Sequence, residues 1–132
     1  MAVTHSTAAR NAATDAVTNL LGSTAKLVFR LSGTVSAPGT AVATLSMSAT
    51  AFGASGTPTA GTAVANAITS DTNATGNASP VATATLQTGA GTVVIHCAVA
   101  ASGSDINMTN GLTVASGDTV SCSSLTYTAL SA

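Results

Sequence analysis

Apolar residues recur at every second position in a series of short runs that begins after Gly22. In one of these runs a single parity is apolar throughout, at Val93, Ile95, Cys97 and Val99. A period of two puts alternate side chains on opposite faces of a β-strand. Turn residues, mainly Gly, Pro, Ser and Asp, separate the runs. The sequence therefore predicts strands at 25–32, 41–48, 51–53, 63–69, 81–87, 92–99, 106–108, 112–114 and 119–128, the last with a bulge near Ser123–Ser124.

The segment before Gly22 has a different period. Between residues 7 and 21, apolar residues recur at the three-to-four spacing of one helix face, at Ala9, Ala13, Val17 and Leu20. Ser6 or Thr7 can cap the start of this helix and Gly22 can close its end, with Arg10 and Asp15 on the opposite side. Because the apolar face is mostly alanine, the helix can approach a neighbouring surface closely.

These runs predict a mainly β protein. Short strands with regular turns are typical of a β-sandwich, here jelly-roll-like or Greek-key, preceded by one N-terminal α-helix. Residues 1–24 are expected to form the arm and helix, and residues 25–132 the sandwich, within a single domain. A chain of 132 residues buries roughly two-thirds of its unfolded surface, so its core needs no metal or disulfide.

Charge is scarce, at 5% of residues against roughly 25% in ordinary soluble domains. The three basic residues, Arg10, Lys26 and Arg30, cannot neutralise many phosphates, so no nucleic-acid partner is expected. No run of roughly 18 apolar residues predicts a membrane span, and no cationic start with an apolar run predicts a secretory signal. We therefore expect the protein to stay in a bacterial cytoplasm until it packs against copies of itself or a larger scaffold.

The few titratable residues do not form a catalytic motif. Asp71, Asp105 and Asp118 each lie in a turn, where an aspartate typically accepts hydrogen bonds from nearby backbone amides. His96 lies between Ile95 and Cys97 and so faces away from them, towards solvent or an interface. We predict no catalytic, cofactor-binding or metal-binding residue. A Ser–His–Asp arrangement stays open, because it is recognised by geometry rather than by sequence.

The other potential metal ligands are too few for a recognisable set. His5 is the only imidazole besides His96, and Asp15 is the remaining carboxylate. Cys97 and Cys122 match no zinc motif and are expected to be free, buried thiols that pack as small hydrophobic groups. Whether the two pair depends on the separation of their Cβ atoms, which the sequence does not give.

Several segments together resemble a known family. Residues 4–12, followed by 15–17, look like the start of small virion-associated proteins of tailed bacteriophages. Further blocks are similar to that group in the same order, at 42–45, 51–53, 65–71, 102–106 and 117–120. The resemblance covers nearly the whole chain and carries no catalytic motif. It implies a virion structural protein, and small β-sandwich proteins on phage heads commonly act as cement or decoration.

The leading hypothesis is therefore a capsid cement protein on the virion surface. Such a protein binds the major capsid protein in many copies and forms a homo-oligomer, possibly a dimer or a trimer. The expected contact regions are Met1–Leu21 and the loops near Pro38 and Pro58. An alternative is a tail or fibre module that binds a host receptor, against which the scarcity of aromatic residues counts. A hydrolase that depends on His96 is a third hypothesis.

Overall fold

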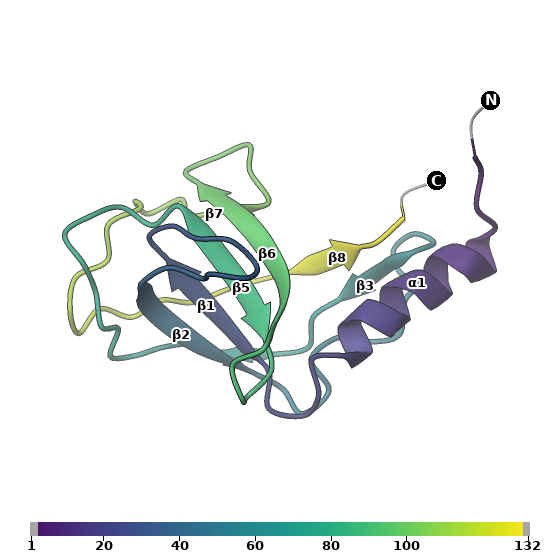
Figure 1. Ribbon diagram of the computed structural model, residues 1–132, viewed down its shortest axis with the longest axis horizontal. Helices are drawn as coiled ribbons and strands as arrows, with labels where there is room; N and C mark the ends of the chain where they lie inside the picture. Colours follow the sequence, from purple (N-terminus) through teal and green to yellow (C-terminus); the bar gives the residue numbers. More distant parts are fainter. Residues whose placement is uncertain (1–2, 131–132) are drawn as a thin grey trace.

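The computed structural model describes residues 3–130 and shows a mainly β protein with one helix (Figure 1). The residues at 1–2 and 131–132 lie outside the described part, so Met1, where the predicted contact region begins, is not placed. The prediction of a β-rich fold with an N-terminal helix is confirmed. The elements are α1 (Thr7–Asn19), β1 (Lys26–Arg30), β2 (Ala41–Met47), β3 (Thr62–Val64), β4 (Ile68–Thr69), β5 (Thr83–Gln87), β6 (Val93–Ala100), β7 (Ile106–Asn107) and β8 (Thr126–Thr128).

Helix α1 begins and ends where its capping residues predict. Ser6 has an extended backbone, and its hydroxyl oxygen accepts a hydrogen bond from the Ala9 backbone N–H at 3.2 Å. After the last helical residue, Gly22 takes a φ of +72°, a left-handed conformation that glycine adopts without strain. The chain then turns directly into β1.

Six strands form one curled sheet in the order β4-β2-β1-β5-β6-β7. All neighbouring pairs are antiparallel except β6 and β7, which are parallel. Leu27, Leu45 and Leu86 lie opposite one another on the inner face, as the period of two predicts. Strands β3 and β8 form a separate two-stranded sheet that lies beside α1 (Figure 1).

The core lies on the inner face of the curled sheet and continues to the end of the helix. Its largest fully buried apolar side chains come from the sheet and from the segments next to it: Leu21, Leu27, Val42, Leu45, Val81 and Leu86. Small residues fill many of the remaining buried positions, namely Ala25, Ala43, Ala51, Ala63, Ala74 and Ala84. Alanine contributes little width, so elements around these positions approach closely.

The curled sheet brings its two outer strands towards the same C-terminal segment. Beyond β4, Asp71 and Val120 exchange two backbone hydrogen bonds of 2.8 and 3.0 Å, and the hydroxyls of Ser70 and Ser121 lie 2.8 Å apart. The chain at 119–126 therefore lies against the β4 edge. Strand β7 forms the other edge of the sheet.

Four of the predicted strands are wrong in extent. The run at 51–53 keeps only an isolated bridge between Phe52 and Ala65. The run at 112–114 forms no strand, because its carbonyls accept single hydrogen bonds from Asn77 and Val81 rather than a ladder. The run at 119–128 keeps only the bridge at Val120 and β8, and the run at 63–69 is broken into β3 and β4. That break occurs where the Asn66 backbone N–H donates to the Ala51 carbonyl. Within the described residues, no helix is long and apolar enough to span a bilayer.

Candidate functional site

The side chains of the four aspartates all bind backbone amides of the chain itself. Each accepts at least one backbone N–H at 2.9–3.0 Å, so the prediction for the three turn aspartates is confirmed. The donors are Ser55 for Asp15, Thr44 and Asn73 for Asp71, Ala98 for Asp105, and Ala115 for Asp118. These bonds fix loops to strands and helix, which is a structural task.

His96 lies on the outer face of the curled sheet, opposite Thr85 of β5. Its side chain lies on the opposite face of β6 from Ile95 and Cys97, as predicted, but it does not lie in open solvent, because the neighbouring Thr85 is fully buried. The residue is half-buried, and its Nε2 atom is buried without a hydrogen-bond partner in the described part of the chain. Among residues 3–130, no three His, Cys, Asp or Glu side chains gather closely enough to hold a metal ion.

Two of the basic side chains lie on the same outer face and bind neighbouring polar groups. Arg30 donates through all three guanidinium nitrogens, at 2.7–3.1 Å, to the Gly39 carbonyl, the Gln87 side-chain oxygen and the Thr85 hydroxyl. Lys26 Nζ donates to the Ser46 hydroxyl at 2.9 Å. Burial lowers the pKa of the Arg30 guanidinium from its ordinary value. Hydrogen bonds to neutral acceptors therefore hold both cationic side chains in place on this face of the sheet.

Both cysteines are free, as predicted, but they are half-buried rather than buried. Burial, and next the negative charge of Asp105, raises the pKa of the Cys97 thiol to about 11. Burial also raises the pKa of Cys122, although its Sγ donates to the Ser124 carbonyl at 3.4 Å. Raised pKa values keep both thiols protonated near neutral pH, where they are poor nucleophiles.

Helix α1 packs on the body through its polar side. Thr14 is fully buried, and its hydroxyl donates to the Gly61 carbonyl and accepts from the Ala129 backbone N–H at 3.1 Å. Asn11 Oδ1 accepts from the Gly61 N–H at 2.7 Å, and its carbonyl accepts from the Ser55 hydroxyl at 2.9 Å. The loop around Pro58 thus holds the helix, although Pro58 itself is exposed.

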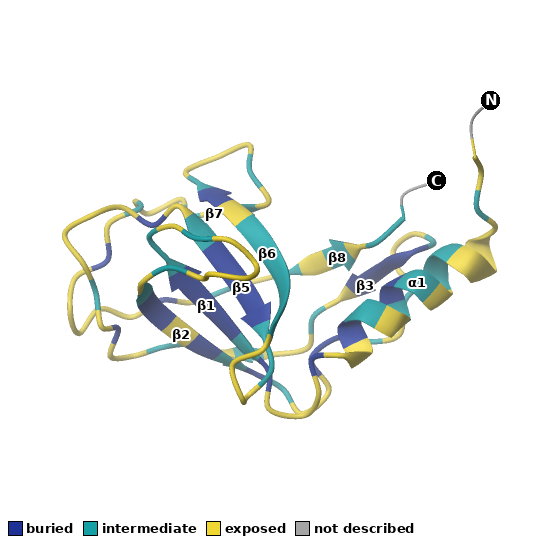
Figure 2. Cartoon of the chain, in the orientation of Figure 1, coloured by how far each residue is buried: buried dark blue, intermediate teal, exposed yellow. Residues whose placement is uncertain are grey.

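The opposite side of α1 faces outwards (Figure 2) and is mostly alanine, although the exposed polar residue Asn19 lies beside these alanines. We call it the outer helix face, formed by Ala8, Ala9, Ala12, Ala16 and Leu20. All five residues are exposed, and the Leu20 side chain is 65% exposed. This arrangement reverses that of an ordinary surface helix, in which the apolar stripe faces the core.

The loop near Pro38 is a second exposed region. It is a hairpin between β1 and β2 in which the Thr34 N–H donates to the Ala37 carbonyl at 3.0 Å. Val35 at its tip is 54% exposed, and Pro38 is exposed beside it. Of the expected contact regions, the helix and this hairpin present apolar side chains to solvent.

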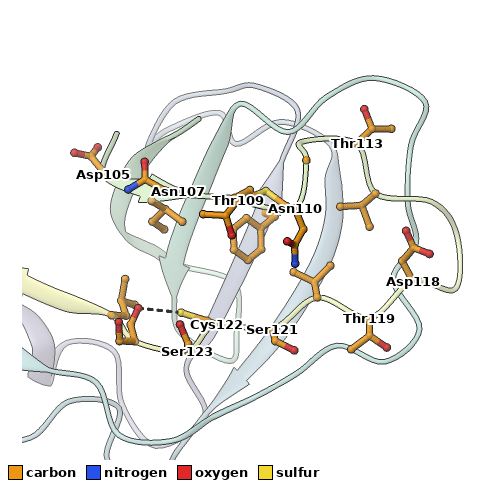
Figure 3. A pocket seen from close by; sticks show the side chains of 18 of the residues that line it. Asp105, Asn107, Thr109, Asn110, Thr113, Asp118, Thr119, Ser121, Cys122 and Ser123 are labelled. Atoms are coloured by element: carbon orange, nitrogen blue, oxygen red, sulfur yellow. Dashed lines mark hydrogen bonds between the residues drawn. The ribbon is translucent and has the colours of Figure 1, made fainter. Parts of the chain in front are cut away.

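A pocket of about 650 Å³ opens between two segments in the C-terminal part of the chain, 105–111 and 118–126. Figure 3 shows Asp105, Asn107, Thr109 and Asn110 along one side. The opposite side is formed by Thr119, Ser121, Cys122 and Ser123, with Thr113 and Asp118 at one end. Buried Phe29 of β1 also lines this space, so the pocket reaches the core. We call it the C-terminal slot.

The sequence contains no signal for the C-terminal slot. Its walls come from 105–111 and 118–126, and the sequence predicts the second wall as part of a strand with a bulge near Ser123–Ser124. Only the curvature of the sheet brings the two walls together.

The comparisons with protein-family models, with curated proteins and with solved structures found no match to this chain.

Proposed function

We propose that this chain is a structural protein of tailed-phage virions, a capsid cement protein that binds the major capsid protein and stabilises the head. Its work is docking in many copies, without a reacting centre. The observation that carries the proposal is the outer helix face, which places the apolar side of α1 in solvent. An exposed apolar face without charge is a surface for a partner.

The shape of this face favours close packing against a flat or grooved partner. Alanine side chains at Ala8, Ala12 and Ala16 follow one another at four-residue spacing along the helix. They let another backbone approach, and Leu20 at the end of the row adds a larger apolar anchor. No charged residue lies among these positions, so binding requires no desolvation of an ion.

The size of the face indicates why many copies are needed. A helix of 13 residues is about 20 Å long, and a face about 10 Å wide offers on the order of 200 Å². A stable complex buries about 800 Å² on each partner, so a single such contact is weak. A lattice of capsid sites that holds neighbouring copies in place raises the effective concentration and turns weak contacts into firm attachment.

The distribution of charge supports binding that depends little on salt. All four aspartate side chains and both outer-face cations bind groups of their own chain. Few charges are left to attract a partner over a distance, so screening by salt has little to remove.

The test uses heads of the encoding phage that have been depleted of this protein. The purified chain is added back, and bound copies are counted after sedimentation. We expect Ala16→Glu to lower binding about tenfold or more, because it places a charge in the contact. Ala101→Glu puts the same charge on an exposed alanine outside α1 and should bind like the unaltered chain.

Binding should change less than about twofold between about 0.05 M and about 0.5 M salt. Release at moderately raised salt, or equal binding by the two glutamate variants, would contradict the proposal. Copy number in virions separates this role from the alternative of a tail or fibre module. Copies on the order of hundreds fit the head shell, whereas a few dozen or fewer fit the tail.

A further inference from the structure

We propose that the C-terminal slot binds the extended N-terminal arm of a second copy, Val3–Ser6, as an added β-strand. The inference goes beyond capsid binding and does not depend on it, because it concerns association of the chain with itself. It assigns a role to a pocket that the proposed function leaves unused.

One wall of the slot is the free edge of the curled sheet. Strand β7 is the last strand in the sheet order and pairs only with β6. The other wall has an unused backbone: the N–H and C=O groups of Ser121, Cys122 and Ser123 make no hydrogen bond within the described residues. A sheet edge facing unpaired backbone groups is a template for an added strand.

The volume of the slot matches a short strand. A strand residue occupies about 3.4 Å along the strand, about 4.8 Å across the sheet and about 10 Å between packed layers, or about 160 Å³. The slot of about 650 Å³ therefore holds about four residues of extended chain. Val3–Ser6, the four residues before α1 that the structure describes, could therefore fit within it.

The lining of the slot matches the alternation of the arm. The lining combines Phe29 and Val120, which are buried, with exposed amide and hydroxyl residues such as Asn110, Thr119 and Ser121, so the slot has an apolar inner side and a polar rim. In an added strand Val3 would face the apolar side and Thr4 the rim, because successive residues point to opposite faces. Both residues are β-branched, which favours extended structure.

Charge also fits this pairing. Asp105 and Asp118 line the slot, and no Lys or Arg does. The arm contains no carboxylate side chain. Neither Asp therefore meets a like charge when the arm enters.

The arm that enters must come from another copy. Val3 is 78% exposed, and Ser6 has an extended backbone immediately before α1. In Figure 1 the arm lies at the end of α1 that points away from the curled sheet, whereas β7, whose residues line the slot, lies in that sheet beyond β3 and β8. An arm-to-slot contact joins two different surfaces of neighbouring copies. When the same contact is repeated from copy to copy, it forms a closed ring if the rotation between neighbouring copies allows the last to meet the first.

The first test is a site-directed cross-link in the full-length chain. Val3→Cys places a thiol on the arm, and Cys122 already lines the slot. Under mild oxidation we expect a disulfide between Cys122 of one copy and the introduced thiol of another, located by mass spectrometry of the peptides. Val35→Cys is the matched control, because Val35 is exposed on a hairpin outside the arm. Equal linkage of Cys122 in the two variants would overturn the inference.

The second test measures self-association by analytical ultracentrifugation. The unaltered chain should associate as its concentration rises, and Val3→Asp should raise the dissociation constant about tenfold or more by removing an apolar contact. Val35→Asp should leave the constant within about twofold, and circular dichroism checks that both variants fold. A chain that stays monomeric, or that associates equally well with either aspartate, would refute arm exchange.

Discussion

Replacing Thr14 by valine tests how α1 is held to the rest of the protein. Valine keeps the shape of threonine and removes only the hydroxyl, which serves two backbone groups: it donates to the Gly61 carbonyl and accepts from the Ala129 N–H. Thr14 is 0% exposed, so water cannot take the place of its hydroxyl. A buried backbone group left without a partner costs about 1–3 kcal/mol.

Counting the Gly61 carbonyl in full and the half-buried Ala129 N–H in part, we expect the free energy of unfolding to fall by about 2–4 kcal/mol. This is a large share of the about 5–15 kcal/mol that stabilises a typical domain. Urea unfolding followed by circular dichroism gives the change as a shift in midpoint, with the slope unaltered.

Two variants control for the other effects of the substitution. Thr14→Ser keeps the hydroxyl and loses one methyl group, so it should cost about 1 kcal/mol. Thr18→Val removes a hydroxyl that binds only the Asp15 carbonyl of its own helix, so it should cost less than about 1 kcal/mol. If the losses in the free energy of unfolding caused by Thr14→Val and Thr18→Val differ by less than about 0.5 kcal/mol, the claim that the Thr14 hydroxyl attaches α1 to the body is wrong.

Two further predictions concern a thiol and a pair of glycines. Cys97 should react slowly with thiol reagents until the pH nears its raised pKa of about 11, and Asp105→Asn should speed the reaction. The contribution of this thiol to the free energy of unfolding is fully present below the ordinary thiol pKa of 9.0 and is lost as the pH rises towards 11. Gly76→Ala should destabilise by more than about 2 kcal/mol, because a Cβ there would lie 2.2 Å from the Ser116 backbone nitrogen. Gly103→Ala, at a φ of +69° with no neighbour within 4 Å, should cost only the left-handed strain of about 1–2 kcal/mol, and thermal unfolding of both variants measures the difference.

The sequence predicts the strands whose two faces differ in burial. In β2 the buried residues Ala43, Leu45 and Met47 alternate with Thr44 and Ser46, which are less buried, so the period of two is visible. In β1 the apolar residues Leu27, Val28 and Phe29 are all buried, so burial does not alternate there. The turn between β5 and β6 is equally predictable, since Gly89 and Gly91 flank its tip. Local rules also give the caps of α1, because Ser6 and Gly22 act within one helical turn.

The sequence does not predict which side of α1 packs inwards. Hydropathy marks the alanine-rich side, but alanine gains little from burial, and the partners of Asn11 and Thr14 lie at residues 61 and 129. Hydrogen bonds to such distant backbone groups leave no local pattern. The C-terminal slot is hidden for a similar reason, since Ser121–Ser124 has no alternating apolar residues and is placed by its contacts with Ser70 and Asp71.

The central claim, docking of a neutral apolar helix face on a capsid lattice, is tested most directly by an electron-microscopy reconstruction of the encoding phage particle. The account predicts this chain on the outer surface of the head in many symmetry-related copies, with Ala12, Ala16 and Leu20 in contact with the major capsid protein. A particle that lacks the chain, or that carries it with this side of α1 in solvent, would contradict the account.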